Sequence, residues 1–193
     1  MILRMRAAGM LLAAWLFLLP ACHRPAPAPV AQGSSTRPAP FMPVFYDSLR
    51  QVFASYGRLR EALALADTAA ANAAALRMQQ QLDSLPLDTL ALPDDSLELV
   101  EGTTGSMRAE LEGLTGEPSL AGKRDAFRML SDMCLDLVLL TGLKGSTLYR
   151  LHDPGAANRA GAYWLNDTPA MKDNPYAGAS ARGVAITDTL HFE

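Results

Sequence analysis

The stretch Gly161-Ala-Tyr-Trp-Leu-Asn-Asp-Thr-Pro-Ala-Met-Lys-Asp-Asn-Pro-Tyr-Ala-Gly178 lies at the centre of residues 145–183, the segment around which the chain is organised. It is rich in turn-forming residues, and it also holds the aromatic residues Tyr163, Trp164 and Tyr176. Turn formers interrupt regular structure, whereas large aromatic side chains usually pack against a core. The stretch therefore predicts an ordered, irregular cap on the rest of the fold, anchored by its aromatic residues.

Four helices are predicted before this cap. The first is the clearest amphipathic helix of the chain, because apolar residues recur at helical spacing from Phe45 to Leu63. Asp67-Thr68 is suited to cap the second helix, and the fourth is the most apolar, so we expect it at the centre of the bundle. The later helices are expected at residues 69–85, 106–114 and about 119–141, with a loop at 86–106 that includes a short helical turn at 95–100.

Residues 147–151 and 184–190 alternate apolar and polar side chains as short strands do. The two segments can pair, although no sequence feature requires it. We therefore predict an all-α fold for residues 41–193, a bundle of about four helices closed by the irregular C-terminal cap and one short β-hairpin. This length is sufficient for a single hydrophobic core.

The beginning of the chain is typical of a bacterial lipoprotein. Two arginines precede an apolar run at residues 7–19, which has the layout of a secretory signal peptide and is too short to span a membrane. Leu19-Pro-Ala-Cys22 then resembles a lipobox, in which the cysteine is lipidated and becomes the first mature residue. The sequence thus predicts a signal peptide at 1–21 and a periplasmic protein held by Cys22 on a membrane, with the outer membrane expected. A signal peptide cleaved elsewhere, with Cys22 an ordinary thiol, is the alternative.

Residues 22–40 are expected to be a tether between this anchor and the domain, because they contain five prolines and nothing from which to build a core. From Cys22 onward the chain keeps 15 of its 17 basic residues and all 20 acidic residues, a formal charge of −5. Nucleic acid is therefore not an expected partner. The only other cysteine is Cys134, so a lipidated Cys22 leaves no pair for an intramolecular disulfide.

Few residues of the folded part indicate chemistry. His152-Asp153 combines one imidazole with one carboxylate, and His191 is the other histidine of the domain. One such pair is a weak metal signal, because a metal site needs several convergent ligands. Met129, Met133 and Cys134 offer soft sulfur ligands within about one helical turn, but the same residues are typical of core packing, which we favour.

The remaining patterns favour structural interpretations. The acidic group at residues 94–101 lacks the spacing of a calcium loop, so a solvated acidic loop is expected. Gly178-Ala-Ser-Ala-Arg182 does not match the Gly-x-Ser-x-Gly motif of serine hydrolases. We therefore predict a protein without enzymatic activity and without a cofactor, Cu or Zn being the alternative.

Several motifs together resemble the domain of unknown function 3347, a family common in Bacteroidetes envelope proteins. The motifs are Phe127-Arg-Met-Leu-Ser131, Tyr149, Gly161-Ala-Tyr-Trp-Leu165, Asn174-Pro-Tyr-Ala-Gly178 and Tyr56-Gly-Arg-Leu-Arg-Glu-Ala-Leu63 followed by Asp67. The resemblance covers roughly residues 44–190. It implies a helical periplasmic domain suspected of handling copper or related metals, found as stand-alone lipoproteins and attached to membrane-fusion subunits of heavy-metal efflux pumps. The resemblance marks as structural motif residues Tyr163, Trp164, Asn174, Pro175, Tyr176 and Gly178.

The chain departs from this family where soft metal ligands are implied. Typical members carry Cys-Pro-Met after the tyrosine of the short strand, and Met with Cys-Gly shortly after Asn-Pro-Tyr-x-Gly. Here Asp153-Pro-Gly155 stands in the first place, and Gly178-Ala-Ser-Ala-Arg-Gly-Val184 contains neither Met nor Cys. The sulfur groups that would bind a thiophilic ion are absent, so we do not transfer the metal site to this chain.

Three functions stay open at this point, and the first is favoured. It is a lipid-anchored periplasmic accessory protein, a non-catalytic module that binds an envelope protein, an efflux component or another non-metal partner. The second is a residual copper- or zinc-binding lipoprotein that uses His152 and Asp153, helped by His191 or by the sulfur group on the fourth helix. The third, an enzyme, rests on no positive feature of the sequence.

Overall fold

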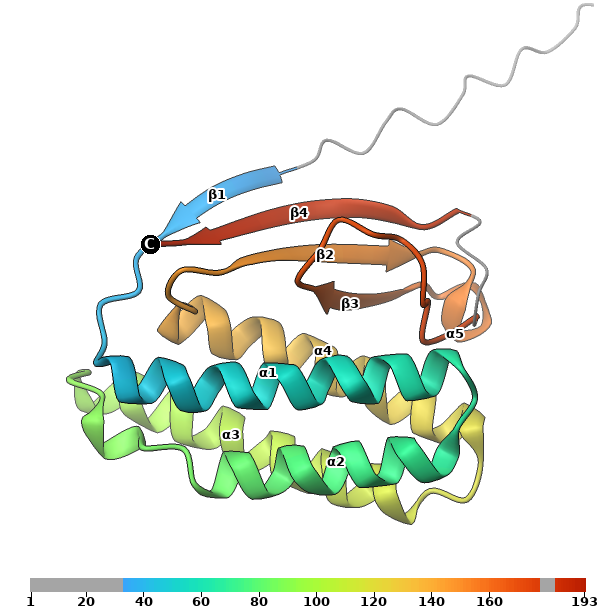
Figure 1. The fold of residues 1–193 in the computed structure, drawn as a ribbon, viewed down its shortest axis with the longest axis horizontal. Coiled ribbons are helices and arrows are strands. Elements are labelled where there is room, and N and C mark those ends of the chain that lie inside the picture. The colour runs from blue at the N-terminus through green and yellow to red at the C-terminus, as the bar shows by residue number, and fades with distance from the viewer. Residues whose placement is uncertain (1–32, 178–182) are drawn as a thin grey trace, which may run out of the picture.

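The computed structural model of the chain describes residues 33–177 and 183–193. The expected signal peptide, Cys22, the first part of the expected tether and Gly178 lie outside the described residues. In the described part, four long helices form a bundle, and a four-stranded sheet lies along one side of it (Figure 1). The long helices are α1 (Pro43–Ala64), α2 (Thr68–Asp83), α3 (Asp94–Gly116) and α4 (Leu120–Thr141).

The first two helices form as predicted. Pro43 occupies the first turn of α1, where its missing N–H would have no helical partner, and α1 buries the apolar stripe that runs from Phe45 to Leu63. The Oδ1 atom of Asp67 accepts a hydrogen bond of 2.9 Å from the backbone N–H of Ala70, which caps α2 as expected. The tight turn between the helices lets α1 and α2 pack against each other.

The third helix is longer than predicted, so the expected loop at residues 86–106 is wrong in its second half. α3 begins at Asp94 and includes Gly102 and Gly105, although a glycine inside a helix costs about 1 kcal/mol relative to alanine. Tertiary packing compensates for this cost, because α3 buries a stripe of side chains at helical spacing. These buried residues are Val100, Thr104, Met107, Leu111 and Leu114. The connection before α3 contains only the short 3-10 helix η1 (Leu87–Thr89).

The fourth helix begins and ends as predicted, but it is buried on one side only. The Oγ atom of Ser119 accepts a hydrogen bond of 3.0 Å from the N–H of Gly122, and Gly142 ends the helix with a φ of 73°. Side chains on the outer side of α4 are at least 36% exposed, namely Met129, Leu139 and Leu140. The helix therefore contributes to the core with one face and meets solvent with the other.

The sheet corrects the all-α prediction. It has the strand order β1-β4-β2-β3 and consists of β1 (Gly33–Arg37), β2 (Thr147–Asp153), β3 (Ala162–Asn166) and β4 (Ala185–Phe192). β2 and β4 pair antiparallel, so the two segments predicted to form a hairpin do meet, but they are the centre of a larger sheet. β3 adds to β2 antiparallel, and β1 adds to β4 parallel. The fold is therefore mostly helical with a mixed sheet.

Strand β3 forms within the segment expected to be an irregular cap. Its central residue, Trp164, lies opposite Leu151 of β2, and both side chains are buried. A short helix, α5 (Ala156–Arg159), connects β2 to β3. The strand forms because β2 offers a backbone ladder beside an apolar layer, and this tertiary effect is hidden in the sequence by the turn formers on either side.

Strand β1 lies in the segment expected to be a tether, so the folded part begins before Phe41. Its sequence, Gly-Ser-Ser-Thr-Arg, carries no large apolar side chain. The strand is held by backbone pairing with β4, and the backbone N–H of Ala39 donates a hydrogen bond of 2.9 Å to the carbonyl of Glu193. A strand held by its backbone alone leaves no hydrophobic pattern from which it could be predicted.

Helices α1 and α4 lie between the sheet and the other two long helices (Figure 1). Strand β3, at one edge of the sheet, contacts α4, and the apolar residues of helices and strands form one continuous core. In the described residues, no helix is both long and apolar enough to cross a membrane. The edge strand β3 is thereby placed beside α1 and α4, at the junction of the bundle and the sheet.

Candidate functional site

The structure does not bring the predicted metal ligands together. Asp153 is buried, and its carboxylate accepts hydrogen bonds from the backbone N–H of Gly155 at 2.8 Å and from Nδ2 of Asn174 at 2.7 Å. Both oxygens therefore fix the turn after β2. The half-buried ring of His152 stacks on Tyr163, with ring centroids 4.3 Å apart. His152 and Asp153 are therefore not arranged around a common metal centre.

His191 lies far from this pair along the same ladder. In the β2–β4 register Thr147 is opposite His191, whereas His152 is opposite Ala185. Five strand residues separate the two positions on β2, a distance of about 17 Å at 3.3 Å per residue. Among the described residues, no group of three or more His, Cys, Asp and Glu side chains could hold an ion. The histidines therefore cannot share one metal.

The sulfur-containing residues of α4 also diverge. Cys134 is fully buried, and this burial raises the pKa of its thiol above the usual range. A cysteine binds metals as the thiolate, so a thiol kept neutral in the core is a poor ligand. Met129 is exposed on the opposite side of the helix. The core-packing prediction therefore holds for Cys134, and Met133 packs against the core while partly buried, but the prediction is wrong for Met129, which is 41% exposed.

Titration of the full-length protein with Cu(I), Cu(II) and Zn(II) is therefore expected to reveal no one-to-one site tighter than about 1 μM. The measurement is isothermal titration calorimetry, with a reductant present for Cu(I). A tighter site that disappears in a His152→Ala variant would restore the residual metal-binding hypothesis.

The aromatic motif residues are placed where they can anchor the end of the chain. Trp164 is buried and meets the ring of Tyr176 edge-on at 5.9 Å. The hydroxyl of Tyr176 donates to the carbonyl of Tyr163 at 3.0 Å, and its backbone N–H donates to Oδ1 of Asn174 at 2.9 Å. Pro175 is also buried. These contacts support the anchoring prediction, which a stability measurement can test.

A different region has the shape of a binding site. A hollow of 490 Å³ lies between α1, the loop that precedes β2 and the end of β3. We call it the α1–β3 groove. Its walls include the partly buried ring of Phe53 and the buried side chains of Leu148 and Leu165. Gly57 lies in the α1 wall, and a Cβ atom built there would meet nothing within 4 Å.

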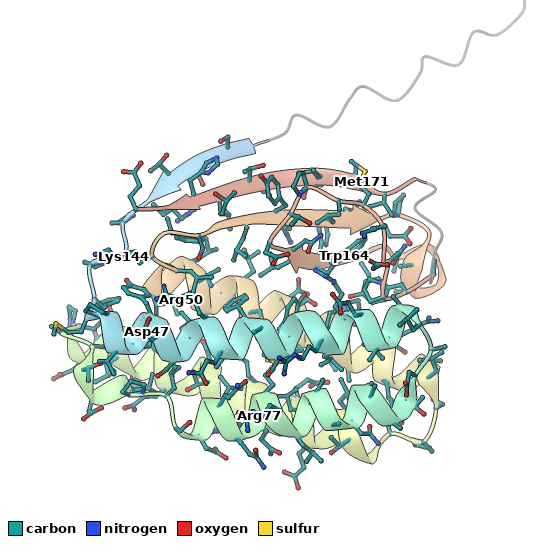
Figure 2. All side chains as sticks on the ribbon, viewed as in Figure 1. Asp47, Arg50, Arg77, Lys144, Trp164 and Met171 are labelled. Carbon is teal, nitrogen blue, oxygen red and sulfur yellow. The ribbon has the colours of Figure 1, made fainter. Side chains whose placement is uncertain are left out.

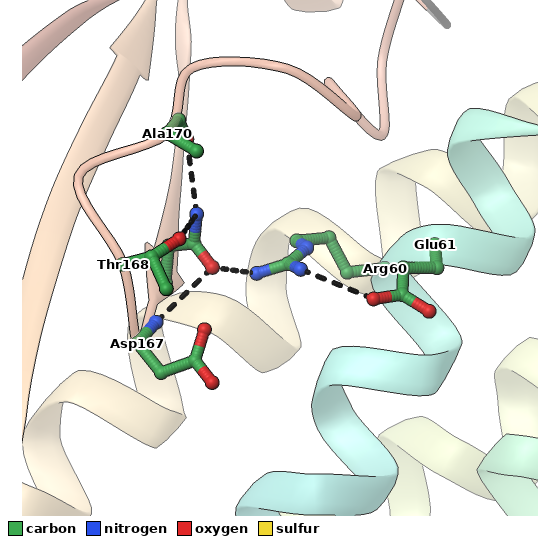
Figure 3. A network of polar contacts seen from close by, with 6 residues as sticks. Arg60, Glu61, Asp167, Thr168 and Ala170 are labelled. Carbon is green, nitrogen blue, oxygen red and sulfur yellow. Dashed lines mark hydrogen bonds and ion pairs between the residues drawn. The ribbon is translucent and has the colours of Figure 1, made fainter.

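Arg60 is the buried charge of the α1–β3 groove. It is only 8% exposed, and one terminal nitrogen, Nη1, donates to Oδ1 of Asn166. The other, Nη2, lies 3.6 Å from the carboxylate of Glu61 (Figure 3). Its Nε is buried and donates to no group of the described residues. The guanidinium is thus held in place on one side and left without a hydrogen-bond acceptor on the other.

Asn166 is itself held by the chain that follows β3. Its Nδ2 donates to the carbonyl of Ala170 at 3.0 Å, and its Oδ1 accepts from the backbone N–H of Asp167 at 3.1 Å (Figure 3). Because the amide is fixed by these bonds, it fixes the orientation of the Arg60 guanidinium in turn.

Two further arginines line the α1–β3 groove. Arg58 is exposed and forms no ion pair within the described residues. Arg50 pairs with Asp47 and donates a hydrogen bond of 3.2 Å to the carbonyl of Lys144, which lies close to it in Figure 2. Arg50 is therefore committed to the protein, whereas Arg58 is available to a ligand.

Tyr56 of α1 lines the groove and connects α1 to β3 and α4. The backbone N–H of Leu165 in β3 donates to its hydroxyl at 3.0 Å, and this hydroxyl lies 2.8 Å from Oγ of Ser131 in α4. Ser131 in turn donates to the carbonyl of Phe127 at 2.8 Å. Burial raises the pKa of Tyr56 above its usual range. The phenol therefore stays neutral and has a structural role instead of acting as a base.

The family model described as Protein of unknown function (DUF3347) matches residues 52–145. The chain belongs to the DUF3347 family. This finding confirms the family inferred from the sequence motifs. Comparison with curated proteins and comparison with solved structures both find no match.

The DUF3347 match runs from the middle of α1 to the end of α4. It includes the α1 wall of the α1–β3 groove, with Gly57, Arg58 and Arg60, whereas the β3 wall lies beyond it. The aromatic motif of β3 also lies beyond the matched residues. The match therefore rests on the helices.

Arg60 was not singled out in the sequence, although a signal was present. Tyr56, Leu59 and Leu63 lie on the buried face of α1, and position 60 falls on the same face, one turn after Tyr56. A charged residue on an apolar helix face needs a partner or a function. That pattern marks Arg60 as an unusual position, although it does not show the other wall of the α1–β3 groove.

Proposed function

We propose that the protein is a lipid-anchored, non-catalytic binding module of the bacterial cell envelope, with the α1–β3 groove as its binding site. The observation that carries the binding role is Arg60, whose buried Nε donates to no group of the described residues beside a hollow of 490 Å³. A buried donor without a partner costs about 1–3 kcal/mol. A ligand that supplies an acceptor would recover this free energy.

The chemistry of the groove supports binding over catalysis. A general base needs a pKa near the working pH. Burial raises the pKa of Tyr56, so this phenol is neutral and hydrogen-bonded at both sides. The groove contains no histidine or cysteine among its lining residues in the described part of the chain. The residues of the groove are therefore suited to recognise a ligand by its shape and charge.

The binding role is tested by native mass spectrometry of the full-length protein, purified gently from the envelope of its own host. We expect a bound small molecule that is lost in Gly57→Leu, because this change fills the open space in the groove. The matched control is Gly113→Leu on the exposed side of α3, where a Cβ also meets nothing within 4 Å. No adduct, or an adduct kept equally by both variants, would contradict the proposal.

The lipid anchor is supported by the signal peptide and the lipobox-like Leu19-Pro-Ala-Cys22. We expect Cys22→Ala to move the protein from the membrane fraction to the soluble periplasmic fraction, because each buried methylene of an acyl chain contributes about 0.8 kcal/mol to membrane binding. Fractionation with immunoblotting measures the change, and Cys134→Ala is the control that should stay on the membrane. A Cys22→Ala protein that remains membrane-bound would show that another feature holds it.

A further inference from the structure

We infer that the α1–β3 groove binds a small molecule with a single carboxylate and an apolar tail. This inference rests on the proposed function, because it names the class of ligand for the same groove. The carboxylate would pair with Arg60, and the tail would lie against Phe53, Leu148 and Leu165.

The free edge of Arg60 has the geometry of a carboxylate receptor. Nη1 is used by Asn166, so the nitrogens left without a hydrogen-bond acceptor in the described residues are Nε and Nη2. These two nitrogens lie on one edge of the guanidinium plane, and two parallel N–H groups match the two oxygens of a carboxylate. Because Asn166 fixes the plane, little conformational entropy is lost when a ligand binds.

Glu61 already places a carboxylate near this edge. Its Oε1 lies 3.6 Å from Nη2, longer than a hydrogen bond, and its side chain is 59% exposed. The pair joins a buried arginine to an exposed carboxylate at a distance longer than a hydrogen bond, so it does not fix the Glu61 side chain in place. Glu61 can therefore turn outward into solvent and leave the edge to a ligand that also buries apolar surface.

The rest of the groove is suited to an apolar tail. Phe53, Leu148 and Leu165 line it, and Gly57 leaves open space on the α1 side. The hollow of 490 Å³ falls within the range of about 300–1,000 Å³ that is common for small-molecule sites. Burial of an apolar ligand body against these side chains is favourable, whereas an inorganic anion would leave them exposed to water.

The charge balance favours one negative charge over two. Arg50, Arg58 and Arg60 line the groove together with Glu61 and Asp167, and Arg50 is already paired with Asp47. The groove is thus close to neutral before a ligand arrives. A carboxylate adds one negative charge opposite Arg60, whereas a phosphate dianion would add a second charge that the two acidic residues repel.

The test is calorimetric titration of the full-length protein, in a neutral detergent, with three defined probes of similar apolar body. They are 4-phenylbutyrate, its neutral amide 4-phenylbutanamide and 3-phenylpropyl phosphate. We expect 4-phenylbutyrate to bind one-to-one and the amide to bind about tenfold more weakly, because it lacks the charge that strengthens the hydrogen bonds to Arg60. The phosphate is expected to bind more weakly than the carboxylate.

Four variants locate the site. Arg60→Lys keeps the charge but loses the two-nitrogen edge, so we expect affinity for 4-phenylbutyrate to fall about tenfold. Glu61→Gln removes the competing carboxylate and should tighten binding. Gly57→Leu should abolish binding without lowering the melting temperature, because leucine favours a helix more than glycine does. Gly113→Leu should bind as the unmodified protein does.

A flat titration with 4-phenylbutyrate, unchanged affinity in Gly57→Leu, or tighter binding of the phosphate would each overturn the inference. Failure of the inference can be told from failure of the proposed function. If the host-purified protein carries an adduct that Gly57→Leu loses, the groove is a binding site even when the carboxylate probe does not bind. If both measurements fail, the groove is not a site for small molecules.

Discussion

Replacement of Trp164 by alanine is expected to lower the free energy of unfolding by about 3–5 kcal/mol, the usual cost of removing a large aromatic side chain from a core. Trp164 is only 1% exposed and lies in the middle of β3, between Leu151 of the neighbouring strand and Tyr176 of the following segment. Its loss would leave a cavity where the sheet meets the bundle. The melting temperature should fall by about 2–4 °C for each kcal/mol in a chain of this size.

Two controls separate packing from other effects. Trp164→Phe keeps an aromatic ring, and it removes an indole Nε1–H that is buried without a partner among the described residues. We therefore expect this change to cost less than half as much as Trp164→Ala. Tyr163→Ala alters the adjacent residue, which is half-buried and stacks on His152. Denaturant unfolding of the three variants gives the comparison, and an unchanged stability in Trp164→Ala would show that β3 does not anchor the fold.

The helices could be predicted where local chemistry and burial agree. Asp67 caps α2, and Gly142 ends α4, because each acts on the backbone within one turn of its own position. α3 shows the limit of this reasoning. Gly102 and Gly105 indicated a loop, but burial of the stripe around Met107 outweighs their cost, and this gain arises only when α3 packs into the bundle.

The strands were harder to predict because their partners are distant in the sequence. β2 and β4 alternate in hydrophobicity and were found, although nothing local showed that they pair. β1 has no apolar pattern and is held through its backbone by a strand about 150 residues away. Such pairing depends on the free edge of β4, which exists only once the sheet has formed.

The candidate site was also hard to predict, because its residues come from distant parts of the sequence. Residues that looked chemically promising, such as His152 and His191, lie at opposite ends of a ladder. Arg60 looked like an ordinary charge on a helix, yet it joins α1 to the end of β3 through Asn166. Convergence of side chains across elements is a property of the fold, so sequence alone could mark the unusual position of Arg60 but could not show its partners.

The protein is also expected to lose stability steeply at alkaline pH. Burial raises the pKa of Cys134, of Tyr56 and of Tyr176 above their usual ranges. In the unfolded chain these groups ionise near their ordinary pKa values, about 8.5 for cysteine and about 10 for tyrosine. Above those values the unfolded state releases protons that the folded state keeps. Each group then lowers the free energy of unfolding by about 1.4 kcal/mol per pH unit, up to its raised folded pKa.

Lys123 has the opposite effect on the pH dependence of stability. Burial lowers the pKa of that amine, so between its folded and unfolded pKa values stability rises with pH and opposes the loss. The three buried acids outweigh one amine, and from pH 10 to 12 we expect a net fall of several kcal/mol, on the order of 1.4 kcal/mol per group and pH unit.

Urea unfolding at a series of pH values measures the slope. Cys134→Ala should remove the part of the loss that begins near about pH 8.5, and Tyr56→Phe a part that begins near about pH 10. If both variants kept the full slope of the unmodified protein, burial of these groups would not be the cause, because removing an ionising group must remove its share of the proton linkage.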